Sequence, residues 1–310
     1  MSEADPHLRA PLAPLAGATP AAPDWFKAAI AMEPERLTVD VEGAAIETLA
    51  WGARGKPGLL FLHGNGAHAD WWRFIAPFFA DDFRVAAISW SGMGGSDHRK
   101  GYKLGTFVAE AFAGAEAAGL FQSPEKPIVV AHSFGGFPLA AMAEAQGERL
   151  RGAVVVDSPA SLPRNALMNR ARPPVSERRD HRVYPTLAEA LARFRFAPEQ
   201  PCEHLFIADF IARAALHEVE GGWSWKFDPR IWAEFELGAP PELAKAKCPV
   251  AVIWGDRSKL MPPDTKAMLA SLDIPNVPAI VIPDAAHHVM VDQPIAFVTA
   301  LRTLTETWAR

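Results

Sequence analysis

A serine stands between a predicted strand and a predicted helix near the middle of the chain. Residues 128–131 are apolar and mostly β-branched, His132 and Ser133 follow them, and two glycines then precede an alanine-rich helical stretch over residues 138–148. The pattern is small-x-Ser-x-small, in which Ala131 and Gly135 are the small residues. Both must be small because so tight a turn brings the strand and helix backbones together. Such a turn holds the serine in a strained conformation with its hydroxyl presented above the sheet.

This unit resembles the nucleophile elbow of the α/β-hydrolase family, whose pattern is G-x-S-x-G, with Ala131 here in place of the first glycine. The resemblance covers nearly all of the chain after residue 36. It implies an α/β-hydrolase fold, in which helices flank a mostly parallel eight-stranded sheet and a helical cap is inserted. A serine at the elbow argues against the family's epoxide hydrolases and haloalkane dehalogenases, which use a carboxylate nucleophile.

Strand and helix patterns alternate over most of the chain. An apolar period of two around Glu42-Gly43 predicts a β-hairpin, as the resemblance also implies. Continuous apolar runs are typical of strands buried on both faces. Such a run lies at residues 58–62, and further strand patterns lie at residues 83–88, 128–132, 153–156, 250–254 and 280–282. Helical patterns lie at residues 106–119, 263–272 and from 294.

Two segments depart from this alternation. Residues 1–35 begin with a stretch rich in alanine and proline, so we expect an N-terminal arm, partly disordered, with a short helix after Asp24. Residues 161–240 contain three helix patterns, which open near Thr186, near residue 203 and at Asp228, and no strand pattern. The sequence therefore predicts a core of residues 36–160 and 241–310, with a helical cap of residues 161–240 inserted.

Three predicted strand ends carry the residues of a nucleophilic site. A serine hydroxyl is a weak nucleophile until a base accepts its proton and a third group holds that base. Ser133, Asp256 and His287 occur in the order serine, acid, histidine that is typical of this fold. Each follows a strand, so the three should meet at the carboxyl edge of the sheet. We predict Ser133 as nucleophile, His287 as base and Asp256 as acid.

Neighbouring residues compete for these roles. Asp157 ends the strand before that of Asp256, and some relatives place the acid there. His288 adjoins His287, but the loop matches the family pattern with His287 in the base position. Two adjacent histidines are also compatible with a metal site. No H-E-x-x-H or carboxylate–histidine spacing accompanies them, so we expect no metal. A plain turn serine at position 133 is disfavoured because a base and an acid are also present.

The oxyanion formed by attack on a carbonyl needs donors placed in advance. The resemblance implies two backbone N–H groups, those of Phe134, directly after the nucleophile, and of Asn65, in the loop after the strand of residues 58–62. Glycines in that loop let the backbone approach the substrate. His63, at the start of the loop, is interpreted as structural.

Composition excludes several classes of protein. Charged residues make up 22% and hydrophobic ones 49% of the 310 residues, and the net charge of -5 gives no indication of nucleic-acid binding. No apolar run reaches the length of a membrane span, and residues such as Glu3 do not suit a secretory signal, so we expect a cytoplasmic protein. Cys202 and Cys248 are interpreted as reduced thiols, with a disulfide left open. Nothing in the sequence predicts the oligomeric state.

These features predict a serine hydrolase that cleaves a carboxylic ester or a related acyl compound through an acyl-enzyme, without a cofactor. A C–C bond hydrolase, a lactonase or an acyltransferase with the same triad is the close alternative. A non-catalytic binding protein on this fold is the distant one.

The predicted cap and the loop after residue 66 are rich in aromatic residues. Many of them must pack the cap onto the sheet, but a cap over a serine site also roofs a pocket. We therefore expect a small-molecule substrate with an apolar acyl or aryl group, in contact with Trp71, Trp72, Trp223 and Trp225. Six arginines between residues 164 and 182 suit either a solvated connection or a gate that attracts anionic substrates.

Overall fold

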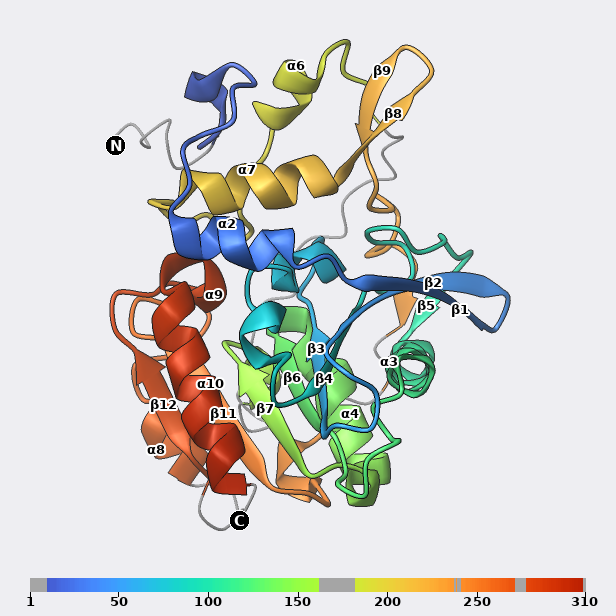
Figure 1. Cartoon of the computed structure of the whole chain (residues 1–310), viewed down its shortest axis with the longest axis vertical. Helices are drawn as coiled ribbons and strands as arrows, with labels where there is room; N and C mark the ends of the chain where they lie inside the picture. The colour runs from blue at the N-terminus through green and yellow to red at the C-terminus, as the bar shows by residue number, and fades with distance from the viewer. Residues whose placement is uncertain (1–9, 162–181, 237, 239–240, 271–276, 309–310) are drawn as a thin grey trace.

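An eight-stranded sheet forms the centre of the molecule (Figure 1). The computed structural model describes residues 10–161, 182–236, 238, 241–270 and 277–308. The strand order is β1-β2-β4-β3-β6-β7-β11-β12, in which β1, β2 and β4 pair antiparallel and the other neighbours pair parallel. The strands of this sheet are β1 (Glu35–Val41), β2 (Ala44–Trp51), β3 (Gly58–Leu62), β4 (Arg84–Ile88), β6 (Ile128–His132), β7 (Gly152–Val156), β11 (Val250–Gly255) and β12 (Ala279–Ile282).

Helices cover both faces of the sheet, so the central strands are buried on both sides (Figure 1). Alternate residues of β3 point to opposite faces: Leu59 and Phe61 join the core beneath α2 and α10, and Leu60 and Leu62 join the core beneath α3, α4 and α8. This burial explains the continuous apolar runs. The α-helices are α2 (Asp24–Ala31), α3 (Leu104–Ala118), α4 (Gly136–Gln146), α6 (Leu187–Leu191), α7 (Leu205–Ala214), α8 (Thr265–Ala270), α9 (Val289–Asp292) and α10 (Pro294–Trp308).

The sequence patterns locate most of these elements. The hairpin of β1 and β2 turns at Glu42-Gly43, and α3 ends at Gly119 in the left-handed conformation, with φ of 83°. Glycine has no Cβ to clash in that conformation, which is why it ends the helix. The short α9, which follows the His287-His288 pair, is an element that the apolar periodicity did not indicate.

The segment between β7 and β11, hereafter the insertion (described residues 182–236), differs from the three helices expected there. Two helices form, α6 and α7, and an antiparallel hairpin of β8 (Leu216–Val219) and β9 (Gly222–Trp225) follows them. The helix pattern that opens near residue 203 forms α7, which ends at Ala214, and the residues after it form a hairpin instead of helix. The turn at Gly221 and Gly222 has φ of 84° and 143°, which suits glycine and reverses the chain.

The predicted third helix at Asp228 is also absent from the described insertion. Asp228 is fully buried, and its carboxylate accepts hydrogen bonds from the Arg230 backbone N–H (2.9 Å) and from the Tyr102 hydroxyl (2.7 Å). These contacts hold a turn, after which β10 (Phe235–Glu236) pairs parallel with β5 (Tyr102–Lys103). Pairing with a distant strand, rather than local helix propensity, decides this segment.

The N-terminal segment packs more closely than an arm would. Residues 1–9 lie outside the described part, but Leu12 is only 1% exposed and a 3-10 turn forms at Ala13–Leu15. Phe26 of α2 packs against Phe206 and Phe210 of α7, with ring centroids 4.9 and 5.7 Å apart. The short helix expected after Asp24 therefore forms as α2, whereas residues 10–23, expected as part of a partly disordered arm, include Leu12 in the core.

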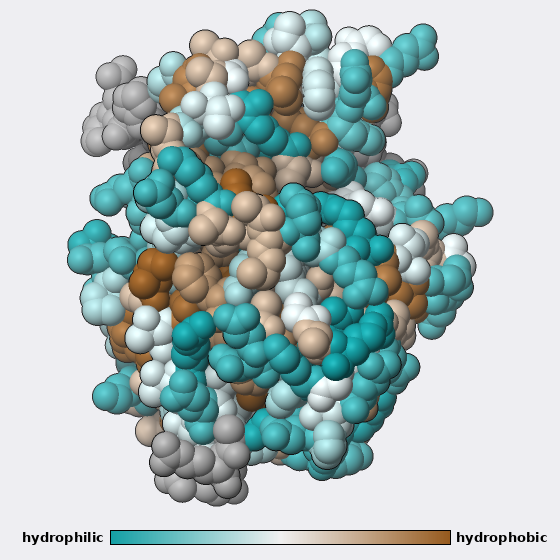
Figure 2. All heavy atoms as spheres, viewed as in Figure 1, coloured by the Kyte–Doolittle hydropathy of each residue, from teal (hydrophilic) through white to brown (hydrophobic). Residues whose placement is uncertain are grey.

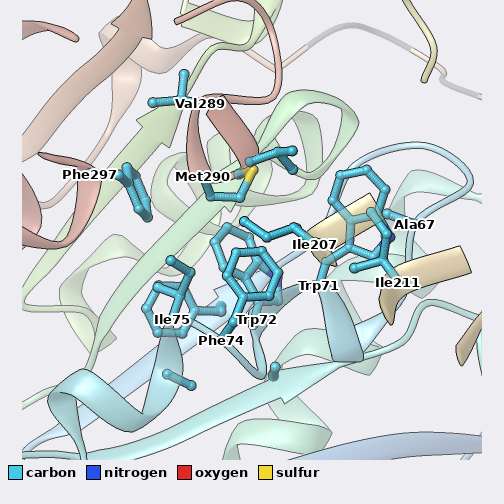
Figure 3. Close-up of a cluster of buried hydrophobic side chains, with 14 of the residues drawn as sticks. Ala67, Trp71, Trp72, Phe74, Ile75, Ile207, Ile211, Val289, Met290 and Phe297 are labelled. Atoms are coloured by element: carbon cyan, nitrogen blue, oxygen red, sulfur yellow. The ribbon is translucent and has the colours of Figure 1, made fainter. Parts of the chain in front are cut away.

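An apolar cluster joins the insertion to the sheet domain (Figure 3). Ile207 and Ile211 of α7 lie beside Trp71, and Met290 of α9 lies near Trp72 (Figure 3). Burial of each such side chain contributes about 1.5–3 kcal/mol, so this cluster fixes the insertion on the sheet domain. On the face drawn in Figure 2, hydrophilic side chains predominate and hydrophobic ones form smaller groups between them. No helix within the described residues is both long and apolar enough to cross a membrane.

Candidate active site

Ser133 occupies the turn between β6 and α4 and has φ of 53°. This left-handed conformation is strained for a residue with a Cβ, and the tight turn imposes it. A Cβ on Gly135 would lie 2.7 Å from the His63 carbonyl oxygen, so only glycine fits there. Ala131, in place of the first glycine of the pattern, is fully buried in the sheet. Ser133 itself is half-buried, so a ligand can reach its hydroxyl.

His287 lies between the serine and a carboxylate. Its Nε2 is 2.8 Å from Ser133 Oγ, and its Nδ1 is 2.8 Å from Asp157 Oδ1. The imidazole is 1% exposed and the Asp157 side chain is fully buried. The three side chains come from the ends of β6, β7 and β12, which lie at one edge of the sheet.

The prediction of Asp256 as the acid was wrong in geometry, because Asp157 contacts the histidine. Asp256 is exposed, and its backbone N–H donates to the Ile282 carbonyl oxygen at 3.1 Å. In the strand order, β7 neighbours β6 whereas β11 lies one strand further from Ser133. Adjacent strands are about 4.8 Å apart, which puts the end of β7 within reach of the serine and its histidine.

Asp157 accepts two hydrogen bonds besides that of the histidine. The Gly255 N–H donates to Oδ2 at 3.0 Å, and the Ser258 hydroxyl donates to Oδ1 at 2.6 Å. A Cβ on Gly255 would lie 2.1 Å from the Ala285 carbonyl oxygen. Glycine there lets the loop that carries His287 pass over the end of β11, so this strand positions the acid without supplying it.

A second carboxylate fixes the loop that carries the histidine. Asp292 of α9 accepts hydrogen bonds from the Ala286 N–H (2.8 Å) and from Nε2 of Gln200 (2.8 Å), and Gln200 Oε1 accepts one from the His288 N–H (2.9 Å). Burial raises the pKa of Asp292 to about 6. Because Gln200 belongs to the insertion, this network connects the insertion to the histidine loop.

The loop after β3 lies directly beside the serine. A Cβ on Gly64 would be 2.9 Å from Ser133 Cβ, so the backbone approaches closely there. Asn65 follows, and its side-chain oxygen accepts a hydrogen bond from Trp232 Nε1 at 2.9 Å. Phe134 is buried and packs edge-on against Trp232, with ring centroids 5.1 Å apart. His63 has a structural contact, as expected: its Nε2 accepts a hydrogen bond from the Trp90 N–H at 3.0 Å, which joins the ends of β3 and β4.

Two further histidines surround His287. His132 Nε2 lies 3.0 Å from the His287 carbonyl oxygen, and the side chain of His288 has no hydrogen-bond partner within the described residues. Burial lowers the pKa of both His132 and His288 well below the ordinary value, so both are neutral at pH 7. Nitrogen atoms of all three lie within 4.8 Å of one another and could ligate a metal ion. A metal held there would compete with Ser133 and Asp157 for His287.

A cavity of about 590 Å³ lies between the loop after β3 and the insertion. The three triad residues do not line it, but His288, which follows His287, and Trp232, which packs against Phe134, do. Asn65 and His288 line it, and so do Trp71 and Trp225, two of the four tryptophans expected to contact the substrate. The other two expected tryptophans do not line it. Trp72 is 1% exposed and stacks on Phe61 of β3, with ring centroids 4.7 Å apart.

Trp223 is held by backbone pairing rather than by a ligand site. It forms an isolated bridge with Tyr184, whose N–H donates to the Trp223 carbonyl oxygen at 2.8 Å. Phe196, Trp232 and His288 line the cavity instead, and no local pattern distinguishes them from core residues. The density of aromatic residues in the insertion was the only signal for Phe196 and Trp232, whereas His288 had been considered only as an alternative base.

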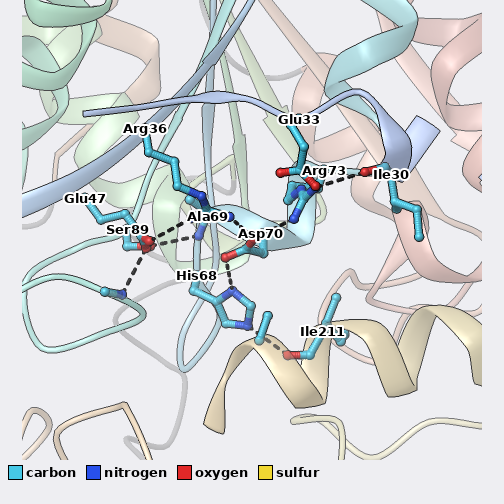
Figure 4. Close-up of polar contacts among 12 residues, drawn as sticks. Ile30, Glu33, Arg36, Glu47, His68, Ala69, Asp70, Arg73, Ser89 and Ile211 are labelled. Carbon is cyan, nitrogen blue, oxygen red and sulfur yellow. Dashed lines mark hydrogen bonds and ion pairs between the residues drawn. The ribbon is translucent and has the colours of Figure 1, made fainter. Parts of the chain in front are cut away.

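A polar network holds the cavity wall near Trp71 (Figure 4). His68 Nε2 is 3.0 Å from the Ile211 carbonyl oxygen of α7, and its Nδ1 is 3.5 Å from Asp70. Burial would raise the pKa of Asp70, but the hydrogen bond from His68 and the nearby Arg36 and Arg73 hold this pKa below its usual value. His68 therefore ties the loop after β3 to α7 of the insertion, and Asp70 lies beside His68, Arg36 and Arg73.

Other sequence expectations have simple outcomes. Cys202 and Cys248 are free thiols, and burial raises their pKa values to about 12 and about 11. Of the six arginines between residues 164 and 182, only Arg182 lies within the described residues. It is exposed and lines the cavity.

A mostly parallel sheet with serine, histidine and aspartate at one strand edge is the architecture of α/β hydrolases. The model of the alpha/beta hydrolase family matches residues 59–301, and the chain belongs to this family. It is therefore a hydrolase of the α/β type.

Individual proteins of known name are similar to this chain at low sequence identity. The chain is 25% identical to an esterase of Mycobacterium tuberculosis over 272 residues, which are 86% of this chain and 88% of that protein. It is 29% identical to epoxide hydrolase 4 of Mus musculus over 120 residues, 38% of this chain and 32% of that protein, so the chain spans about a third of the length of this relative.

Solved structures share the fold at low identity. The thioesterase domain from the curacin biosynthetic pathway is similar with a TM-score of 0.71 and 21% identity, over 86% of this chain and 99% of that one. A carboxylesterase from Bacillus subtilis is similar with a TM-score of 0.64 and 16% identity, over 90% and 95%.

Proposed function

We propose that the protein is a serine hydrolase that cleaves a carboxylic ester through an acyl-enzyme, with Ser133 as nucleophile, His287 as base and Asp157 as the orienting acid. The observation that carries the proposal is the pair of 2.8 Å contacts, from His287 Nε2 to Ser133 Oγ and from His287 Nδ1 to Asp157 Oδ1. The similarity to a mycobacterial esterase over most of both chains supports an ester as substrate.

In the acylation step, Ser133 Oγ attacks the carbonyl carbon of the ester while its proton passes to His287 Nε2. Buried Asp157 holds the imidazole with its proton on Nδ1 and stabilises the imidazolium that forms. When the tetrahedral intermediate collapses, the C–O bond to the alcohol breaks and His287 returns the proton to the leaving oxygen. The products of this step are an alcohol and a serine ester of the acyl group.

Water then releases the acyl group by the same route. His287 takes a proton from water, the hydroxide attacks the acyl carbon, and Ser133 leaves with the proton. In both steps the backbone N–H groups of Phe134 and Asn65 serve as donors to the oxyanion. The position of Phe134 directly after the nucleophile and the close approach of Gly64 to Ser133 support this assignment. One such donor contributes about 2.7–4 kcal/mol.

The insertion acts in this proposal as a cap over the reacting carbonyl. Trp71, Phe196 and Trp225 line the adjoining cavity and offer an apolar surface to the acyl or aryl part of the substrate. No cofactor takes part, because the serine, the histidine and water supply each bond and proton of the reaction.

A fluorophosphonate probe tests the proposal. We expect covalent labelling of the native protein, located on Ser133 by peptide mass spectrometry, and none of Ser133→Ala or of heat-unfolded protein. Hydrolysis of 4-nitrophenyl acetate should fall by at least about 10⁴-fold in Ser133→Ala, since members of such a triad act as a unit. Turnover by Ser133→Ala within about tenfold of the parent would refute the assignment.

A further inference from the structure

The cavity that is lined by Asn65, Trp232 and His288 carries charged side chains of one sign only. Arg182, Arg193, Arg195 and Lys226 line it, all from the insertion. Among the described residues that line this cavity there is no aspartate or glutamate. Composition does not explain this, because the chain has 36 acidic and 31 basic residues. The cavity is thus positive in a protein that is negative as a whole.

Several described arginines outside the cavity have carboxylate partners. Arg99 lies 3.0 Å from Glu110 and Arg213 lies 2.7 Å from Asp209. Within the described part of the chain, none of the four cavity cations forms such a pair. Four like charges that face one space repel one another, and a bound anion would relieve that repulsion.

Contacts with uncharged groups hold two of these cations in place. The Arg182 guanidinium lies over the Tyr184 ring at 5.3 Å, and Lys226 Nζ donates to the Ala214 carbonyl oxygen at 2.7 Å. Such contacts orient a cation but leave its charge unneutralised. Guanidinium groups also offer paired N–H donors that match a carboxylate or a phosphate.

His288 and Asn65 also line the cavity, and each follows a residue of the site directly in the chain, His287 and Gly64. His288 is 5% exposed, and neither of its ring nitrogens has a partner in the described structure. A buried polar group without a partner is destabilising, and a bound ligand that pairs with it removes this penalty. This second observation indicates that a polar molecule occupies the cavity when substrate is bound.

We propose that the substrate is an ester that carries an anionic group, carboxylate or phosphate, joined to the reacting carbonyl by an apolar segment. The anionic group binds among Arg182, Arg193, Arg195 and Lys226, and the apolar segment lies against Trp71 and Trp225. This inference deepens the proposed function and rests on it, since it names the substrate class of the same site. It also combines two expectations from the sequence, an apolar acyl or aryl substrate and a group of arginines that attracts an anionic one. In this proposal, the tryptophans and the cations of the cavity bind different parts of the same substrate.

Two esters of equal chain length test the inference, 4-nitrophenyl hydrogen adipate, which has a terminal carboxylate, and 4-nitrophenyl hexanoate, which is neutral. We expect kcat/KM to be about tenfold higher for the adipate ester at low salt. The ratio should fall toward one at about 0.5 M NaCl because salt screens the cations. The double variant Arg193→Gln/Arg195→Gln should also bring the ratio toward one, through KM for the adipate ester.

Arg54→Gln is the matched control, since Arg54 is an exposed arginine that pairs with Glu35 outside the cavity. It should leave the ratio unchanged. Equal kcat/KM for the two esters in the parent, or an equal fall for both in the double variant, would overturn the inference and leave the proposed function standing. Hydrolysis that survives Ser133→Ala would instead refute the proposed function.

Binding provides a test that does not depend on turnover. Isothermal titration of Ser133→Ala protein with adipate, hexyl phosphate and hexanol compares a carboxylate, a phosphate and a neutral probe. We expect at least one anion to bind about tenfold more tightly than hexanol and to lose this advantage in Arg193→Gln/Arg195→Gln. The tighter anion identifies the group that the site prefers. Equal binding of all three probes, or none, would overturn the inference even if esters are hydrolysed.

Discussion

Replacement of Asp157 by asparagine tests which carboxylate serves His287. In the parent, Asp157 Oδ2 accepts from the Gly255 N–H, and Oδ1 accepts from the Ser258 hydroxyl and lies 2.8 Å from His287 Nδ1. An asparagine has one acceptor oxygen and one NH₂ group, so it cannot satisfy both sides in the same way. The variant is nearly isosteric, so the packing of the site is retained.

The backbone decides which way the amide turns. The Gly255 N–H can only donate, so the amide oxygen should face it and the NH₂ should face His287 and Ser258. The serine hydroxyl can rotate to accept, and the imidazole must then accept at Nδ1. That tautomer carries its proton on Nε2 and cannot take one from Ser133. The expected loss of kcat is about 10⁴-fold, or about 5 kcal/mol of barrier.

Steady-state hydrolysis of 4-nitrophenyl acetate measures the effect, with circular dichroism as the check on folding. Asp256→Asn is the control, because Asp256 is exposed and its prediction as the acid came from the sequence alone. We expect its kcat to stay within about twofold of the parent, as for other exposed sites. A large loss in Asp256→Asn together with near-parental turnover in Asp157→Asn would refute the reasoning.

Three further predictions follow from the geometry. Gly64→Ala places a Cβ 2.9 Å from Ser133 Cβ, so kcat should fall by about tenfold or more. Gly101→Ala is the control, because nothing lies within 4 Å of a Cβ there, and its kcat should not change. Equal kcat values for the two variants would contradict this prediction. Trp72→Ala should lower the free energy of unfolding by about 3–5 kcal/mol, whereas Trp225→Ala should mainly raise KM, as urea unfolding and kinetics would show. The raised pKa of Asp292, about 6, means that the native state binds this proton more tightly than the unfolded chain, so its stabilisation is full below about pH 4 and is lost as pH rises through 6. Asp292→Asn should therefore gain stability relative to the parent, by up to about 3 kcal/mol, between pH 4 and pH 7.5, and a difference constant with pH would count against it.

Local patterns predicted the parts of the fold that local physics controls. The continuous apolar runs predicted strands such as β3 and β6, because a strand buried on both faces has no polar side. The small residues around Ser133 predicted the turn, because no larger side chain fits between the strand and helix backbones. The order of the serine and histidine along the chain was sufficient to propose the contact between Ser133 and His287.

Long-range pairing decided what those patterns could not. The hairpin of β8 and β9 and the turn at Asp228 form because of their partners, Tyr184 and Tyr102, which are distant in sequence. Likewise, the packing of α7 against the loop after β3 decides which aromatic residues of the insertion lie in the core and which line the cavity. Side chains of the same type, such as Trp71 and Trp72, then have different surroundings although they are adjacent in the chain.

The choice between Asp157 and Asp256 shows the same division. By itself the sequence determined that both aspartates end strands, and hence that both lie at the edge of the sheet that carries Ser133. Only the tertiary structure determined that β7 lies between β6 and β11, which buries Asp157 beside His287 and leaves Asp256 exposed. The physical reason is that strand order arises from hydrogen bonds between segments far apart in the chain, which no local pattern of residues encodes.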